Sequence, residues 1–66
     1  MLIRLPHEWL LAELLIFLRQ NRRIAYYVGN DAIEMIALDL AEEATGHALV
    51  AAWQQQHPEV PAEIEP

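Results

Sequence analysis

The sequence predicts an all-α protein: a helical hairpin with one helix over residues 7–28 and a second over residues 31–56. Apolar residues recur at helical spacing along both ranges, and a Gly-Asn-Asp stretch separates them. In addition, 55% of the 66 residues are hydrophobic and none is cysteine. A domain of this size buries only about 60% of the surface that its unfolded chain exposes. We therefore expect two hairpins to dimerise into a four-helix bundle.

The first helix is expected to begin beside Pro6, because a missing N–H is harmless in the first turn. Gly29 would end it with a left-handed cap. One apolar stripe then runs along the helix, made of Leu10, Leu14, Phe17, Leu18, Ile24, Ala25 and Val28.

The second helix is expected to begin at Asp31, whose carboxylate can accept backbone N–H bonds of the first turn. Glu34 follows three residues later, as in a capping box. Gly46 costs ~1 kcal/mol relative to alanine inside a helix. We expect one continuous helix to about Gln56, with a break at Gly46 as the alternative. Its core stripe consists of Ile33, Ile36, Ala37, Leu40, Ala41, Ala44, Ala48, Ala51 and Ala52.

An α+β fold is the alternative, with short strands at residues 2–5 and 24–28. Residues 24–28 are rich in β-branched and aromatic residues, and residues 2–5 consist mostly of large apolar residues. Two short strands alone make a marginal sheet, which favours the hairpin. Residues 57–66 contain three prolines and three glutamates. They are expected to form an acidic, disordered tail behind a single helical domain at residues 1–56.

Charge is distributed unevenly along the chain. Residues 1–30 contain all four arginines and two glutamates, whereas residues 31–66 contain eight acidic residues and no lysine or arginine. The net charge is −6, which repels a phosphate backbone at long range. A nucleic-acid role would therefore depend on one local basic and aromatic patch, formed by Arg19, Arg22, Arg23, Tyr26 and Tyr27.

The surplus of apolar and aromatic residues predicts a non-enzymatic regulator or inhibitor. We expect it to form a homodimer and to bind and modulate a second protein, as antitoxins and phage inhibitors do. The residues expected to bind the partner are Trp9, Phe17, Arg19, Arg22, Arg23, Tyr26, Tyr27 and Trp53. The residues expected at the dimer interface are Leu10, Leu14, Phe17, Leu18, Leu40, Ala44 and Ala48. A nucleic-acid-binding regulator is the alternative.

The opening stretch "IRLPHEWLLAEL", residues 3–14, resembles the ribbon-helix-helix repressors, in which an edge strand ending in proline leads into the first helix. That resemblance implies DNA binding and supports the alternative function. The expected hairpin is also similar in architecture to small dimeric four-helix bundles.

Catalytic, metal and cofactor sites are not expected. No two of His7, His47 and His57 have the i, i+4 spacing of a helical metal site. The adjacent Glu42 and Glu43 would point to different faces of a helix. The apolar run at residues 9–18 is shorter than the roughly 20 residues that span a bilayer. We expect no membrane association and a cytoplasmic location.

Overall fold

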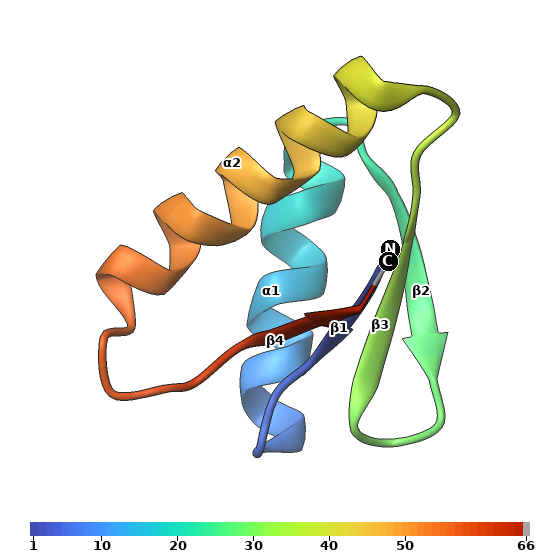
Figure 1. Cartoon of the computed structure of the whole chain (residues 1–66). Coiled ribbons are helices and arrows are strands. Elements are labelled where there is room, and N and C mark those ends of the chain that lie inside the picture. The colour runs from blue at the N-terminus through green and yellow to red at the C-terminus, as the bar shows by residue number, and fades with distance from the viewer. Residues whose placement is uncertain (66) are drawn as a thin grey trace.

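The computed structural model describes residues 1–65, which form an α+β fold (Figure 1). The elements in chain order are β1 (Leu2–Arg4), α1 (Glu8–Gln20), β2 (Ile24–Val28), β3 (Ala32–Ile36), α2 (Leu40–Gln56) and β4 (Glu63–Glu65). The predicted all-α hairpin is therefore wrong. Strands are present where the alternative placed them, at the N-terminus and at residues 24–28, and β3 and β4 complete the sheet.

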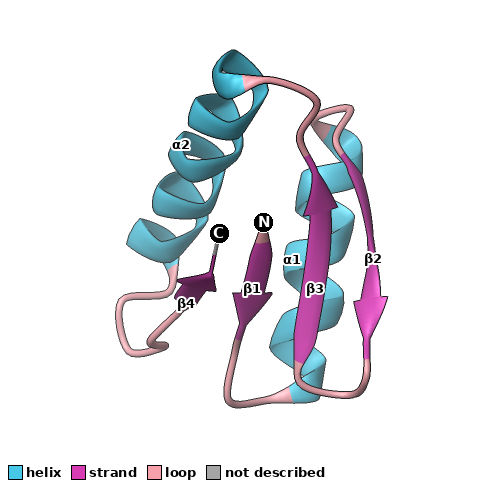
Figure 2. Ribbon diagram, turned by 45° about the vertical axis from the view of Figure 1, so that its right-hand side comes forward, coloured by secondary structure: helices cyan, strands magenta, loops and turns pink. Residues whose placement is uncertain are grey.

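Within residues 1–65 the four strands form one antiparallel sheet in the order β2-β3-β1-β4. Ile3 of β1 lies at its centre, opposite Ile33 of β3 and Ile64 of β4. This strand order, with a helix between β1 and β2 and another between β3 and β4, is the split βαβ arrangement. Both helices lie on one face of the sheet and leave the other face open (Figure 2).

The core lies between the helices and the covered face of the sheet. Its main members are Ile3, Leu5, Leu10, Leu11, Leu14, Leu15, Leu18, Ala25, Ile33, Met35, Val50 and Trp53. Helix α2 runs unbroken through Gly46, where a Cβ would collide with the Met35 side chain. The helix therefore approaches the sheet through Gly46, Val50 and Trp53, while the predicted alanine stripe faces solvent at Ala44 and Ala48.

Helix α1 ends at Gln20 and not at residue 28, because the chain reverses through Arg22. The Arg23 N–H donates to the Leu18 carbonyl at 2.9 Å, and the Arg22 N–H donates to the Arg19 carbonyl at 3.0 Å. These are the two bonds of a Schellman motif, with Arg22 at the position that usually holds glycine. Its φ of 63° is accordingly left-handed. The turn delivers residues 24–28 to the sheet as β2.

Helix α2 begins at Leu40 and not at Asp31. The Asp39 carboxylate accepts the Glu42 N–H at 2.8 Å, and Glu42 accepts the Leu38 N–H at 3.2 Å, which satisfies two donors at this end. Asp31 instead lies in the turn between β2 and β3, after Gly29 with φ 63°.

The segment expected to be a disordered tail contains β4, described as far as Glu65. The Gln54 side-chain amide donates to the carbonyls of His57 and Val60 and accepts the Ala62 N–H. The His57 ring stacks on Trp53 with centroids 3.9 Å apart. These contacts turn the chain back so that Ile64 packs against the core.

Candidate functional site

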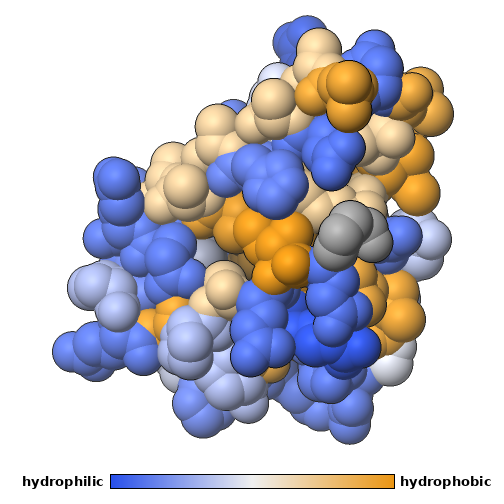
Figure 3. Space-filling model, viewed as in Figure 1, coloured by the Kyte–Doolittle hydropathy of each residue, from blue (hydrophilic) through white to orange (hydrophobic). Residues whose placement is uncertain are grey.

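Exposed apolar side chains concentrate on β2. Among the described residues, the exposed large apolar or aromatic side chains are Trp9, Ile16, Ile24, Tyr26, Tyr27, Val28, Leu38 and Leu40. Four of these eight belong to the five residues of β2. Figure 3 shows apolar side chains along the side of the molecule formed by β2, β3 and the loop that follows β3. This is the surplus of apolar surface that the composition predicts.

β2 is also an edge strand whose outer side can be identified from hydrogen bonds. The Met35 N–H donates to the Met1 carbonyl at 2.9 Å, and the Met35 carbonyl accepts the Met1 ammonium at 3.1 Å, so both groups point toward β1. Ala25 is the β2 residue opposite Met35. Because the direction alternates along a strand, the N–H and C=O groups of Ala25 and Tyr27 point away from the sheet.

Arg19 covers one of these outward groups. Its Nε and Nη2 donate to the Ala25 carbonyl oxygen at 3.2 and 2.9 Å. The N–H and C=O of Tyr27 have no hydrogen-bond partner within residues 1–65. The half of the edge nearer the C-terminal end of α1 is therefore guarded by an arginine, and the half around Tyr27 is open to another strand.

The opposite edge of the sheet is closed to strand addition. β4 has three residues, with exposed Glu63 and Glu65 at its two ends and Pro61 just before it. Short length, charge and proline are the features by which edge strands avoid pairing with other chains. β2 has none of them.

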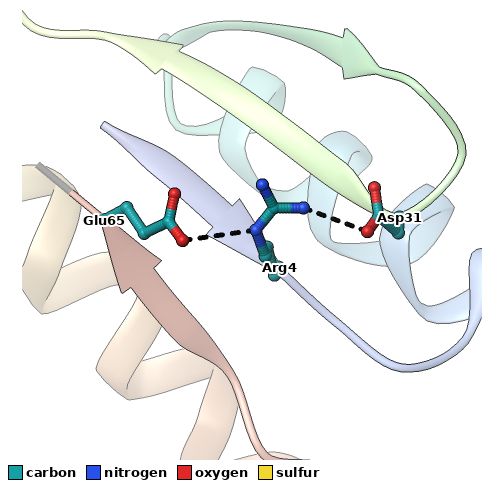
Figure 4. Close-up of polar contacts among 3 residues, drawn as sticks. All are labelled: Arg4, Asp31 and Glu65. Carbon is teal, nitrogen blue, oxygen red and sulfur yellow. Dashed lines mark hydrogen bonds and ion pairs between the residues drawn. The ribbon is translucent and has the colours of Figure 1, made fainter.

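The open face of the sheet has an apolar half and a charged half. Ile24, Tyr26 and Val28 of β2 lie on the first half, while Arg4 of β1 lies on the second. Arg4 donates to Asp31 at 3.0 Å and to Glu65 at 3.4 Å (Figure 4). The hydrogen bond and negative charge of Glu65, followed by the charge of Asp31, raise the pKa of Arg4 above its ordinary value. Arg4 thus stays charged and ties β1 to β4.

The structure does not bring the predicted partner-binding residues together. Trp53 is 3% exposed in the core, because α2 turns this side toward the sheet, so it is unavailable to a partner. Phe17 is half-buried against the core. Trp9 is exposed on α1, where it stacks with His7 at a centroid distance of 6.0 Å.

The predicted dimer interface is largely used inside one chain. Leu10, Leu14 and Leu18 are buried by the chain's own sheet, whose presence the hairpin prediction did not include. The remaining members except the half-buried Phe17 are exposed on α2: Leu40, Ala44 and Ala48.

The basic and aromatic patch is divided by the strand. Tyr26 and Tyr27 are adjacent in β2 and therefore point to opposite faces of the sheet. Arg19 is occupied by the Ala25 carbonyl, whereas Arg22 and Arg23 form no ion pair within residues 1–65. This arrangement gives little support to a stacking platform for bases.

No metal-binding cluster of three or more histidine, cysteine or acidic residues occurs in the described part of the chain. Across the same residues, no helix has both the length and the apolar character required to cross a bilayer. Comparisons with protein families, curated proteins and solved structures find no match.

We did not predict the free edge at Tyr27 from the sequence. The signal that could have located it is the uncharged run of Ile24–Val28, which has strong strand character and lacks proline and charge. What the sequence does not show is which side of the strand β3 occupies.

Proposed function

We propose that the protein is a non-enzymatic protein–protein interaction module that forms a homodimer by pairing β2 with β2 of a second copy. The observation that carries this proposal is the unguarded edge at Tyr27, whose backbone groups point away from the sheet. Strand addition at such an edge satisfies those groups with main-chain hydrogen bonds. The two sheets then become one continuous sheet.

Charge favours a second copy as the occupant of this edge. β2 carries no charged residue, so pairing it with itself brings no like charges together. Arg22 and Arg23, which form no ion pair within residues 1–65, precede the strand, and Asp31 lies in the turn that follows it. In an antiparallel pair the start of one strand meets the end of the other, so these arginines lie toward the turn of the second copy that contains Asp31.

Sedimentation equilibrium tests the dimer directly. In the micromolar range we expect a species of twice the 7.6 kDa chain mass. Tyr27→Lys should give a folded monomer, because it places two like charges at the contact. Ile16→Lys is the matched control, since it adds the same charge to an exposed side chain on α1 and should leave the dimer intact. A folded wild-type monomer throughout this range overturns the proposal.

The proposal places this dimer in the cytoplasm. A chain without cysteine needs no disulfide and is unaffected by the reducing conditions of that compartment. Cell fractionation with an antibody against the protein tests this location.

A further inference from the structure

The register of the dimer is limited by the direction of the β2 backbone. In a two-fold antiparallel pair that uses the outward groups of Ala25 and Tyr27, the axis passes through Ala25, Tyr26 or Tyr27. Pairing about Ala25 joins the two Ala25 residues. Pairing about Tyr26 joins Ala25 to Tyr27 twice, and pairing about Tyr27 joins the two Tyr27 residues.

Arg19 discriminates among these three registers. A carbonyl oxygen has two lone pairs, and both are used when Nε and Nη2 of Arg19 donate to Ala25. Pairing about Ala25 loses both bonds of its central pair, because each bond ends on the Ala25 oxygen of one copy, which Arg19 already occupies. Pairing about Tyr26 keeps two of its four bonds and leaves the Tyr27 N–H of each copy facing an occupied oxygen, without a partner. Pairing about Tyr27 also keeps two bonds, those of its central pair, and both Tyr27 N–H groups are then satisfied.

We infer that the two copies pair about Tyr27 and that Arg19, by occupying the Ala25 carbonyl, selects this register. This inference rests on the proposed homodimer. Tyr26 then lies opposite Val28 of the second copy on the open face, an aromatic and β-branched pair of the kind that stabilises sheets. Arg19 acts here as a specificity-determining residue of the interface.

Disulfide cross-linking reads the register, and the chain has no cysteine to interfere. In the inferred register, residues 26 and 28 of different copies form a non-hydrogen-bonded pair with Cα atoms about 4.5 Å apart, within the range that a disulfide spans. Tyr26→Cys and Val28→Cys chains are mixed, oxidised with diamide and weighed by mass spectrometry. We expect the mixed disulfide to exceed either symmetric product at least fivefold.

Pairing about Tyr26 gives a different result in the same experiment. There, residue 26 faces residue 26, so Tyr26→Cys alone should cross-link and the mixed product should be minor. That outcome, in chains shown to be dimeric before oxidation, overturns the register and leaves the homodimer standing. Chains that are monomeric before oxidation overturn the homodimer itself, and the register with it.

The role of Arg19 is tested in the same cysteine chains. Arg19→Ala frees the Ala25 carbonyl, so pairing about Tyr26 recovers its four bonds. We expect the symmetric Tyr26→Cys product to rise at least fivefold relative to the chain that keeps Arg19. Gln20→Ala, which removes the exposed side chain next to Arg19 at the end of α1, should leave the products unchanged. An unchanged pattern in Arg19→Ala overturns the assignment of register selection to Arg19.

Discussion

β2 and β4 are the two edges of the sheet formed by residues 1–65, and they are built in opposite ways. β4 is three residues long, carries Glu63 and Glu65 and follows Pro61, whereas β2 is five residues long and uncharged. A sheet with two open edges extends into a fibre, while one open edge that pairs with itself closes as a dimer. The contrast between the edges is therefore what limits the proposed assembly to two copies.

The largest expected effect comes from placing proline at adjacent positions of β2. The Tyr26 N–H points toward β3, so Tyr26→Pro removes a sheet hydrogen bond and should destabilise the fold by about 2 kcal/mol. The Tyr27 N–H points outward, so Tyr27→Pro should leave a folded chain. It should raise the Kd of the dimer at least thirtyfold, since two bonds are lost at about 1 kcal/mol each. Urea unfolding and sedimentation measure the two effects. Equal loss of folding in both variants would contradict the assigned direction of the edge.

Removing the charges of β4 should make the second edge of the sheet available for pairing. Glu63→Thr combined with Glu65→Thr removes both charges from this edge, so strand addition becomes available on both sides of the sheet. We expect species larger than the dimer to form at a concentration at least tenfold lower than for the wild type, as measured by light scattering. Glu8→Thr combined with Glu59→Thr is the matched control, because it makes the same change of charge at exposed positions outside the sheet. If the control assembles equally, net charge and not the β4 edge is the cause.

A smaller effect concerns the turn that delivers β2 to the sheet. Arg22 has a left-handed φ of 63°, a conformation that costs a residue with a Cβ roughly 1–2 kcal/mol. Arg22→Gly should therefore raise the free energy of unfolding by about 1 kcal/mol, after allowing for the greater freedom of glycine in the unfolded chain. Urea unfolding in the monomeric Tyr27→Lys background measures this without a contribution from dimerisation. Arg23→Gly, at a residue with ordinary φ, should not stabilise the fold.

This turn explains why the sequence predicted one long helix. With no glycine between Gln20 and Ile24, the helical spacing of apolar residues continues across the boundary. The Schellman motif at Arg22 is strained locally and is compensated by contacts made after folding, such as the Arg19 bonds to the Ala25 carbonyl. Such compensation is tertiary and cannot be found by local propensity.

The start of the second helix was misplaced for a different reason. The chain contains two stretches with the same cap signal, Asp31 with Glu34 and Asp39 with Glu42. Only the second pair forms a cap, while residues 32–36 become β3. Local capping chemistry fits both stretches equally. The choice between them depends on Ile33 and Met35, which reach the core only from a strand.

The candidate site could be predicted only in part. The sequence does indicate more apolar and aromatic residues than a core of this size can hold, and Tyr26 and Tyr27 are exposed on β2. It does not show which backbone groups are free, because this depends on the register between β2 and β3. Trp53, expected to bind a partner, lies in the core because α2 presents Val50 and Trp53 to the sheet, with Gly46 allowing the close approach.

The smallest expected effect tests the charges at the ends of the open edge. Asp31→Asn removes the acid in the turn toward which the arginines before β2 of the second copy lie. The contact occurs twice in the dimer, so at about 0.5 kcal/mol for each exposed pair the Kd should rise about fivefold at low salt. The difference should shrink as salt is added, because exposed charges are screened. Asp39→Asn removes an equal charge outside the sheet, at the start of α2, and should not change the Kd.

Asp31 also binds Arg4 within its own chain, so the loss in Asp31→Asn has two sources that must be separated. Exchanging the charges in the double variant Arg23→Asp with Asp31→Arg restores the attraction across the interface but not the contact with Arg4. Recovery of the dimer in the double variant, relative to Arg23→Asp alone, therefore attributes the effect to the facing copy. A double variant weaker than either single variant would show that the two positions do not meet, and that opposite charges at the two ends of β2 play no part in its self-pairing.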